Sequence, residues 1–230
     1  PAQAPGNVIA DLDSGEDATA MDRAIVGFSP TIGLFPGSRP GSAYADAVAL
    51  CGVARAIAAQ LPAIGGLLSI APGLDATRFR NDLTADGWRV RACDDADVPF
   101  VASVGDRVVI RAWRGGIGPL IARSTIVMGQ AGTANEAAAA GGVPVVALGR
   151  PNEKKDAWYR KRQAGLLGEA LYVTPADLSD AAREVRALLD DAPRRLRMGA
   201  IGRERMGPPG GAAAVAQKIA DLTRASSAAC

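Results

Sequence analysis

Two short segments of the chain carry residues suited to holding a diphosphate. The first is Gly37-Ser38-Arg39, which follows an apolar run from Thr31 to Phe35 and precedes a helical pattern. In such a turn, backbone N–H groups and the Ser38 hydroxyl can donate to phosphate oxygens, and Arg39 can pair with two of them at once. An ordinary strand-to-helix turn with a solvated arginine uses the same residues. Because three residues specify little, this motif by itself favours the ordinary turn.

The second segment is longer and runs Gly129-Gln130-Ala131-Gly132-Thr133-Ala134-Asn135-Glu136. Its small side chains let a ligand approach the backbone, and a helix that begins at Gly132 or Thr133 turns its first N–H groups and its dipole toward an anion. Thr133 either caps this helix or donates to phosphate. Glu136 either reaches back as the second half of a capping box or accepts from paired ribose hydroxyls. A well-capped helix and a diphosphate site fit the segment equally well.

Two further segments have weaker signals. Residues 153–163 form a charged stretch that enters a helix and could wall a ligand cleft or touch an acidic lipid surface. The favoured interpretation is a solvated helix face with Trp158 docked on the core. The segment Trp113-Arg114-Gly115-Gly116-Ile117 is a glycine-rich loop that could shape a pocket for a nucleotide base.

The composition excludes several classes of chemistry. The 230 residues contain no histidine, so the chain cannot supply an imidazole base, a Ser-His-Asp triad or a histidine-ligated metal. Three widely spaced cysteines fit neither a disulfide framework nor a zinc site, and we expect no metal. A net charge of +2 with mixed signs argues against a nucleic-acid partner. Without an export signal or a spanning apolar run, the expected location is the cytoplasm.

Short apolar runs alternate with helical spacing, which predicts an α/β fold: a Rossmann-like, mostly parallel sheet with helices on both faces. We expect residues 1–30 to be a linker or the remnant of a preceding domain, 31–211 a nucleotide-sugar-binding domain, and 212–230 a terminal helix. The expected strands are Thr31 to Phe35, Gly66 to Ile70, Arg89 to Cys93, Val108 to Ile110, Thr125 to Met128, Val143 to Leu148 and Ala170 to Val173. The expected helices are Tyr44 to Gln60, Ala76 to Ala85, Ile117 to Arg123, Thr133 to Ala140, Trp158 to Leu167, Pro175 to Leu189 with Thr174 as N-cap, Arg194 to Arg205 and Ala212 to Ala225.

The order of motifs resembles the C-terminal half of lipid-A-disaccharide synthase and, more closely, the lipid-A-disaccharide-synthase-related proteins. The segments that carry the resemblance are Gly6 to Asp11, Leu34 to Arg39, Gly129 to Ala137, Gly142 to Val146, Arg162 to Gly168 and Arg203 to Gly210. Two departures stand out. Val8 lies where the family commonly has proline, and Arg150 to Tyr159 is more charged than the glycine-rich loop of the family.

The resemblance implies the donor-binding half of a two-domain GT-B glycosyltransferase, a hexosyltransferase when complete. It implies a UDP-sugar donor, an acceptor that is unknown and in some relatives lipid-linked, and no cofactor. The general base and any peripheral contact with the inner face of the membrane would belong to the other half. The terminal helix would cross back toward that half, and this chain alone would bind nucleotide without turning it over.

The same resemblance implies a set of nucleotide-sugar-binding residues. In this set the Gly37-Ser38-Arg39 turn meets the diphosphate, as does the start of the second helix; Glu136 holds the ribose, and Gln163 faces the sugar or the diphosphate. The complete set is Gly37, Ser38, Arg39, Gln130, Gly132, Thr133, Glu136 and Gln163.

Three other functions compete with this interpretation. A UDP-N-acetylglucosamine 2-epimerase or related hydrolase shares the architecture, but the chain lacks histidine and the paired acidic motifs usual in those enzymes. A nucleotide-sensing or scaffold domain would keep the fold and lose transfer. A dehydrogenase is disfavoured because no Gly-x-Gly-x-x-Gly fingerprint follows the first strand.

Overall fold

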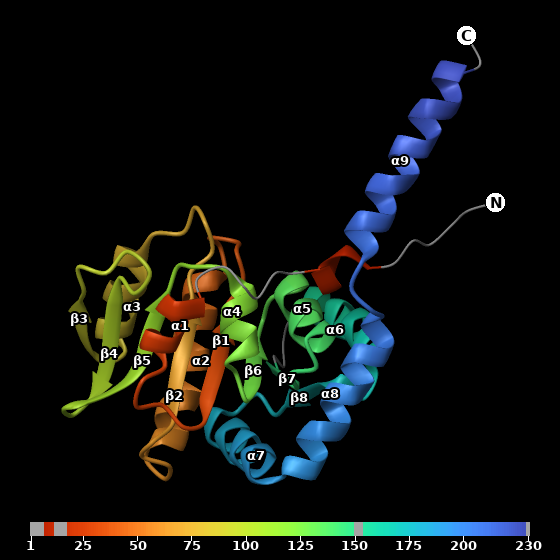
Figure 1. The fold of residues 1–230 in the computed structure, drawn as a ribbon. Coiled ribbons are helices and arrows are strands. Elements are labelled where there is room, and N and C mark those ends of the chain that lie inside the picture. The colour runs from red at the N-terminus through yellow and green to blue at the C-terminus, as the bar shows by residue number, and fades with distance from the viewer. Residues whose placement is uncertain (1–6, 12–17, 150–153, 229–230) are drawn as a thin grey trace.

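The described strands form one sheet of eight in the order β3-β4-β5-β2-β1-β6-β7-β8 (Figure 1). The computed structural model describes residues 7–11, 18–149 and 154–228. The strands are β1 (Thr31–Phe35), β2 (Gly65–Ser69), β3 (Arg89–Ala92), β4 (Phe100–Val104), β5 (Arg107–Trp113), β6 (Ile126–Gly129), β7 (Val145–Leu148) and β8 (Leu171–Thr174). From β5 to β8 all neighbours are parallel, whereas β3, β4 and β5 pair antiparallel.

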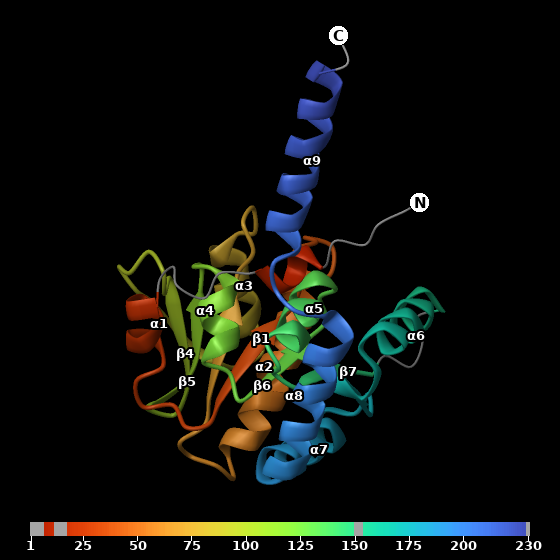
Figure 2. The ribbon, with the colours of Figure 1, turned by 45° about the vertical axis from the view of Figure 1, so that its right-hand side comes forward.

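Helices cover both faces of this sheet, as Figures 1 and 2 show from two directions. The helices are α1 (Ala18–Ala24), α2 (Ala43–Ala58), α3 (Ala76–Ala85), α4 (Ile117–Ala122), α5 (Thr133–Ala140), α6 (Lys154–Leu167), α7 (Leu178–Asp190), α8 (Ala192–Met206) and α9 (Gly211–Ala228), with short 3-10 turns η1 (Val8–Asp11) and η2 (Gly168–Ala170). Strand β6 shows the alternation: Ile126 and Met128 join the core formed with α2, α3 and α7, while Val127 joins the core formed with α1, α4 and α5. The predicted fold class is confirmed.

The main difference from the sequence-based prediction is the strand β4, which the pattern did not reveal. Strand β4 forms a hairpin with β5 through the two-residue turn Gly105-Asp106, in which Gly105 has a φ of +59°. Because β4 is short and follows a polar stretch, its apolar residues give no clear period. The hairpin adds an antiparallel edge to a sheet that is otherwise parallel.

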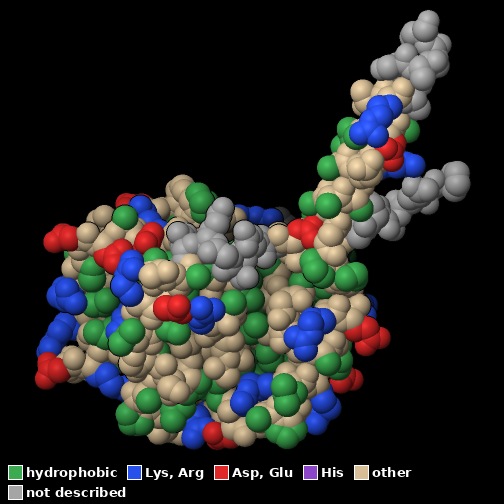
Figure 3. Space-filling model, viewed as in Figure 1, with side chains coloured by type: hydrophobic (Ala, Val, Ile, Leu, Met, Phe, Trp, Pro, Cys, Tyr) green, Lys and Arg blue, Asp and Glu red, His purple; other side chains and the backbone are tan. Residues whose placement is uncertain are grey.

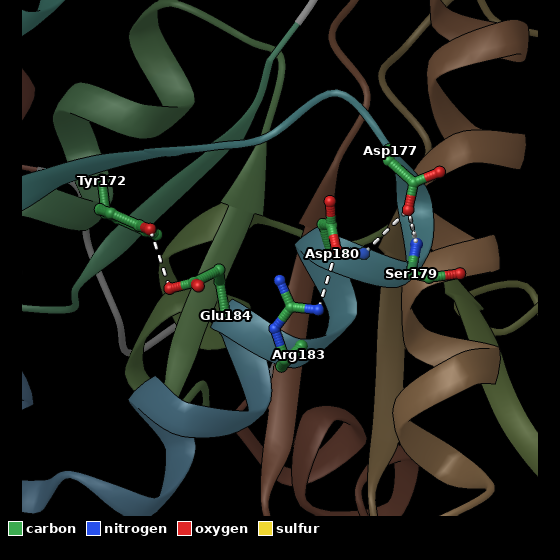
Figure 4. A network of polar contacts seen from close by, with 6 residues as sticks. All are labelled: Tyr172, Asp177, Ser179, Asp180, Arg183 and Glu184. Atoms are coloured by element: carbon green, nitrogen blue, oxygen red, sulfur yellow. Dashed lines mark hydrogen bonds and ion pairs between the residues drawn. The ribbon is translucent and has the colours of Figure 1, made fainter.

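A second difference concerns α7, which begins three residues later than expected. Thr174 is the last residue of β8, and Asp177 is the N-cap: its Oδ1 accepts hydrogen bonds from the N–H groups of Ser179 and Asp180, both at 2.9 Å (Figure 4). An aspartate is a better cap than threonine and also complements the helix dipole. A hydrogen bond of 3.0 Å from the Tyr172 hydroxyl to Glu184 then ties β8 to α7.

Two described segments ahead of β1, η1 and α1, form regular structure within residues 1–30, for which the sequence predicted a linker or the remnant of a preceding domain. Met21 of α1 is fully buried in one of the two cores. The guanidinium of Arg111 donates to the carbonyl oxygens of Ala24 and Val26, both at 2.8 Å, so it fixes the end of α1 against β5. Helix α1 is therefore part of the packed body.

Helix α9 leaves that body as a projecting rod (Figures 1 and 3). It starts after the break Gly207-Pro208-Pro209-Gly210, where the Asp11 carboxylate of η1 accepts hydrogen bonds from the N–H groups of Gly210 and Ala212. Its exposed apolar side chains include Ile219 and Leu222, at 60% and 59% exposure. In the described part of the chain, no helix is long and apolar enough to cross a membrane.

Met21→Ala tests whether α1 belongs to the folded body. Removing this buried side chain should lower the free energy of unfolding by about 2–5 kcal/mol, through lost apolar burial and the cavity left behind. Urea denaturation measures the effect. The matched change Val26→Ala removes a 66% exposed side chain and should alter stability by less than about 0.5 kcal/mol. Equal, small effects would show that α1 does not pack on the core.

The anchor of α9 should depend on pH. Hydrogen bonds from the backbone N–H groups of Ala212 and Gly210 lower the pKa of Asp11 below its ordinary value of 3.8. This contribution is therefore complete above pH 3.8 and is lost as the pH falls through the lowered pKa. NMR titration of the Gly210 and Ala212 amides should show an inflection below pH 3.8 that Asp11→Asn removes and Asp221→Asn leaves in place. An inflection at 3.8 or above would contradict the contact.

Candidate functional site

The candidate site lies where the direction of the chain through the sheet reverses. Strand β1 pairs in parallel with β2 on one side and with β6 on the other. From β1 the chain crosses through α2 to β2, whereas from β6 it crosses through α5 to β7 on the opposite side. Helices α2 and α5 pack on opposite faces, so the loops that enter them diverge. Ligands of open α/β sheets bind in the crevice at such a switch point, outside the carboxyl ends of the strands.

The two sequence motifs are in contact at this point. Phe35 and Gly129, the last residues of β1 and β6, are partners in the strand register, and Gln130 donates its N–H to the Phe35 carbonyl at 2.9 Å. Gly37 has a φ of +100°, and a Cβ added to it would lie 4.0 Å from the Cα of Ala131. The structure thus brings both predicted loops to one edge of the sheet, side by side.

The first loop presents a free cation at the switch point. The Arg39 carbonyl accepts hydrogen bonds from the N–H groups of Ser42 and Ala43, which fixes the backbone of the loop. The Ser38 and Arg39 side chains are exposed. No carboxylate among the described residues pairs with the Arg39 guanidinium. It can therefore bind an anion without breaking an ion pair.

The second loop leads into a helix whose start has no side-chain cap. Gly132, not Thr133, is the N-cap residue of α5, and no side chain accepts from the first N–H groups. The predicted capping by Thr133 and the capping box with Glu136 are therefore wrong, because a capping box needs the hydroxyl residue at the N-cap itself. Thr133 is exposed and Glu136 is half-buried. Both side chains remain free of the helix terminus.

Helices α2 and α5, which begin at the two sides of the switch point, both start without a side-chain cap, as does α4, which begins after β5. By contrast, α3, α7 and α8 are capped by Asp75, Asp177 and Asp191. Uncapped N–H groups leave a local positive potential that an anion can satisfy.

Gln163 lies beneath the second loop and not in open solvent. It is 4% exposed, and its Nε2 donates to the carbonyl oxygens of Ala131 at 3.2 Å and Gly132 at 3.5 Å. Gln130 donates to the Leu148 carbonyl at the end of β7, at 3.2 Å. Both residues therefore hold backbone of the site. Whether either touches a ligand stays a prediction.

Asn135 is a structural residue of this site to which the sequence pattern gave no role. It is fully buried in the first turn of α5 and donates to the Gly129 carbonyl at 3.2 Å and to the Gln163 Oε1 at 3.4 Å. Its Oδ1 has no hydrogen-bond partner in the described residues. The only signal in the sequence was a polar side chain among small ones at the buried face of a helix.

Of the two weaker motifs, only Gln163, at the end of the segment 153–163, contacts the second loop. Trp158 is 64% exposed, so its expected docking on the core is wrong; Arg162 stacks over its ring at 5.9 Å. Trp113 is fully buried and donates from Nε1 to the Gly116 carbonyl at 2.9 Å. Strand β2 separates β5 from β1, so the loop after Trp113 lies two strands from the switch point. Its role in base binding stays a prediction.

Neither a cluster of metal ligands nor the thiol of Cys51 provides a further reactive site in the described residues. No cluster of three or more potential metal ligands occurs among them. Cys51 is buried, and burial raises the pKa of its thiol far above the usual range, so it stays protonated and unreactive.

The matches to known proteins come from solved structures and not from sequence comparison. Comparison with family models and with curated protein sequences gives no match. UDP-GlcNAc 2-epimerase from Neisseria meningitidis, solved with UDP-GlcNAc, is 12% identical with a TM-score of 0.55, and the match covers 88% of this chain and 48% of that one. The Anabaena protein HepE, in complex with UDP-glucose, is 16% identical with a TM-score of 0.53 over 95% and 55% of the two chains. The calicheamicin glycosyltransferase CalG4 is 18% identical with a TM-score of 0.53 over 85% and 44%.

The chain has the fold of a GT-B half-domain. It spans about half the length of the structures it matches. These identities establish the fold alone. They support the architecture expected from the motifs but give no specific support to lipid-A-disaccharide synthase among the enzymes that share it.

Gly129→Ala tests the close packing under the second loop. A Cβ at this position would lie 1.8 Å from the Asn135 Oδ1, so α5 must shift or Asn135 must leave its place. We expect a loss of about 1–3 kcal/mol in unfolding free energy. The control Gly165→Ala adds a methyl group on α6 with nothing within 4 Å, and should stabilise by about 0.5–1 kcal/mol. Similar values for both variants, measured by thermal or urea unfolding, would contradict this packing.

Proposed function

We propose that this chain is the UDP-sugar-binding half of a glycosyltransferase. The observation that carries the proposal is the contact between two loops that can bind an anion at the switch point. One loop presents Arg39, which has no ion pair among the described residues, and the other leads to the uncapped start of α5. A diphosphate has the charge and the oxygen acceptors that these groups need. Two structures with the same fold, solved with UDP-GlcNAc and UDP-glucose, support a nucleotide-sugar ligand.

Each predicted site residue has a role in this proposal. Gly37 and Ser38 offer a backbone N–H and a hydroxyl to the diphosphate beside Arg39, and Gly132 and Thr133 do the same at the start of α5. Glu136 lies one turn into α5 without a cationic partner in the described residues, so its carboxylate is available for the paired hydroxyls of a ribose. Gln130 and Gln163 hold the loop between them.

In this mechanism the contribution of the chain is electrostatic. As the glycosidic bond to the donor breaks, negative charge grows on the departing UDP. Preorganised N–H groups and Arg39 stabilise that charge without needing to reorient, which lowers the barrier to transfer. The general base that activates the acceptor hydroxyl would come from outside these 230 residues. We therefore expect nucleotide binding without turnover by this chain alone.

The finer assignment is a member of the lipid-A-disaccharide-synthase-related group, with an acceptor that could be lipid-linked. It rests on the motif order and not on the comparisons. The terminal rod α9 fits the same proposal: its exposed Val215, Ile219 and Leu222 fall at spacings of four and three, on one side of a helix. In the complete enzyme this stripe would pack on the acceptor-binding half, through which contact with the membrane would also be made.

A 2-epimerase function is the second candidate, because epimerases are among the structures that share the fold. Both candidates require UDP to bind at the same loops. They differ in what the complete enzyme does with UDP-GlcNAc alone: an epimerase releases or interconverts the sugar without an acceptor, whereas a transferase does not. A scaffold domain would bind no nucleotide.

Titration of the chain with UDP tests the proposal. Arg39→Ala should weaken UDP binding about 10- to 100-fold, the range expected for one charge-assisted hydrogen-bonding partner. Glu136→Ala should weaken binding of UDP and uridine alike, because Glu136 is assigned to the ribose. Isothermal titration calorimetry provides both affinities.

Arg89→Ala is the matched control for Arg39. Arg89 is also an exposed arginine, paired with Asp106 at 2.8 Å at the far edge of the sheet, and its loss should leave UDP affinity within twofold. Absence of UDP binding by the unmodified chain, or an equal loss in both arginine variants, would overturn the proposal.

A further inference from the structure

Three amide side chains donate hydrogen bonds to backbone carbonyls in and around the second loop. Gln130 comes from the end of β6, Asn135 from the first turn of α5, and Gln163 from the middle of α6. Their Nε2 or Nδ2 groups donate to the backbone carbonyls of Leu148, Gly129, Ala131 and Gly132, and Asn135 also donates to Gln163. Every carbonyl of the loop from Gly129 to Gly132, apart from that of Gln130, accepts from this cluster.

Burial makes the hydrogen bonds of these amide side chains important for stability. Asn135 is 0% and Gln163 is 4% exposed, and an amide withdrawn from water is costly unless its donors are paired. Gln163 shares the inward side of α6 with Leu167, four residues on, while Trp158, Lys161, Arg162 and Leu166 face solvent. Among the side chains of α6 whose burial the structure describes, Gln163 is the polar one that is turned inward, and it holds the loop.

The geometry of the peptide unit links these carbonyls to the ligand side of the loop. A trans peptide is planar, so its C=O and the N–H that follows point in opposite directions. Gln163 draws the Ala131 and Gly132 carbonyls toward α6, and this orients the N–H groups of Gly132 and Thr133 away from α6, toward the open start of α5. In the same way Asn135 fixes the Gly129 carbonyl, and the next N–H, of Gln130, donates to Phe35 at the base of the Arg39 loop.

We infer that Gln163, supported by Asn135, is a positioning residue that sets the direction of the diphosphate-binding N–H groups from behind the loop. This inference rests on the proposed function for the identity of the ligand, and it revises the expectation that Gln163 itself faces the sugar or the diphosphate. Gln163 acts through the loop backbone, on the phosphates. Through these hydrogen bonds, Gln163 also connects α6 to the backbone of the second loop at the switch point.

Gln163→Met tests the inference, since methionine keeps the length and packing of the side chain and removes the donor. The two probes are UDP and uridine, which differ only in the diphosphate. We expect the variant to bind UDP at least tenfold more weakly and uridine within twofold of the unmodified chain. A general loss of structure would weaken both ligands together, so the ratio of the two affinities isolates the diphosphate.

A second readout needs no ligand. The amide resonances of Gly132 and Thr133 should shift in Gln163→Met, and their hydrogen exchange should accelerate, while amides of α3 at a distance stay unchanged. The matched control Gln60→Met replaces an exposed glutamine beyond the end of α2 and should change neither the affinities nor these amides. If Gln163→Met proves too unstable to purify, Gln163→Glu replaces it, because glutamate keeps the shape and puts an acceptor where the donor was.

The outcomes separate the two proposals. If the unmodified chain does not bind UDP, the proposed function is overturned. The amide resonances of Gly132 and Thr133 then decide alone whether Gln163 orients the loop backbone. Normal UDP binding that Gln163→Met leaves intact overturns the positioning role and spares the proposed function. An equal loss of UDP and uridine affinity, or unmoved resonances at Gly132 and Thr133, also overturns the positioning role.

Discussion

The parallel pairing of β1 with β6 is the contact on which the rest of the structure depends. It places Phe35 beside Gly129, so the two loops that follow leave the sheet at the same height and in opposite directions. The placement of two helix starts at one edge of the sheet follows from this pairing and from the requirement that each crossover helix pack on its own face of the sheet. Every residue discussed as a ligand contact, from Gly37 to Glu136, derives its position from that register.

The groups that the two loops offer to a ligand are mainly backbone N–H groups. A glycine N-cap is less stabilising than a serine or aspartate N-cap by only about a few tenths of a kcal/mol, so α5 loses little stability by starting at Gly132. Helices α3, α7 and α8 have an aspartate N-cap, and α5 does not. Helix α2, on the other side of the switch point, also starts without a side-chain cap. The small residues around the start of α5 let a ligand reach its first N–H groups, so an anion can complete this site.

Hydrogen bonds from the start of the rod α9 to Asp11 join it to the body. The Asp11 carboxylate receives the N–H groups at the start of α9, so residues from the two ends of the chain meet there. This makes the direction of α9 a property of the folded body, although most of the helix is outside it (Figure 3). A helix that has exposed apolar side chains and is held at its start by Asp11 is well suited to bind a second unit in one orientation.

Local sequence signals were sufficient wherever neighbours along the chain determine the outcome. The apolar run of β1, the helix α3 behind its aspartate cap and the small residues of α5 were all predictable, because propensity and periodicity act within one element. The fold class followed from their alternation. In the same way, the types of residue at Gly37 to Arg39 and Gly132 to Glu136 indicated a backbone site for an anion before any contact was known.

Other features depend on distant parts of the chain, and the tertiary structure alone decided them. The exchange of Thr174 for Asp177 as the cap of α7 reflects where β8 ends in the sheet, and the burial of Met21 reflects a core built by later elements. The role of Gln163 depends on α6 crossing behind a loop about thirty residues earlier, and the exposure of Trp158 likewise depends on how α6 sits on the rest of the fold. Such long-range pairings have no period in the sequence, since they arise only when the sheet closes and brings the elements together.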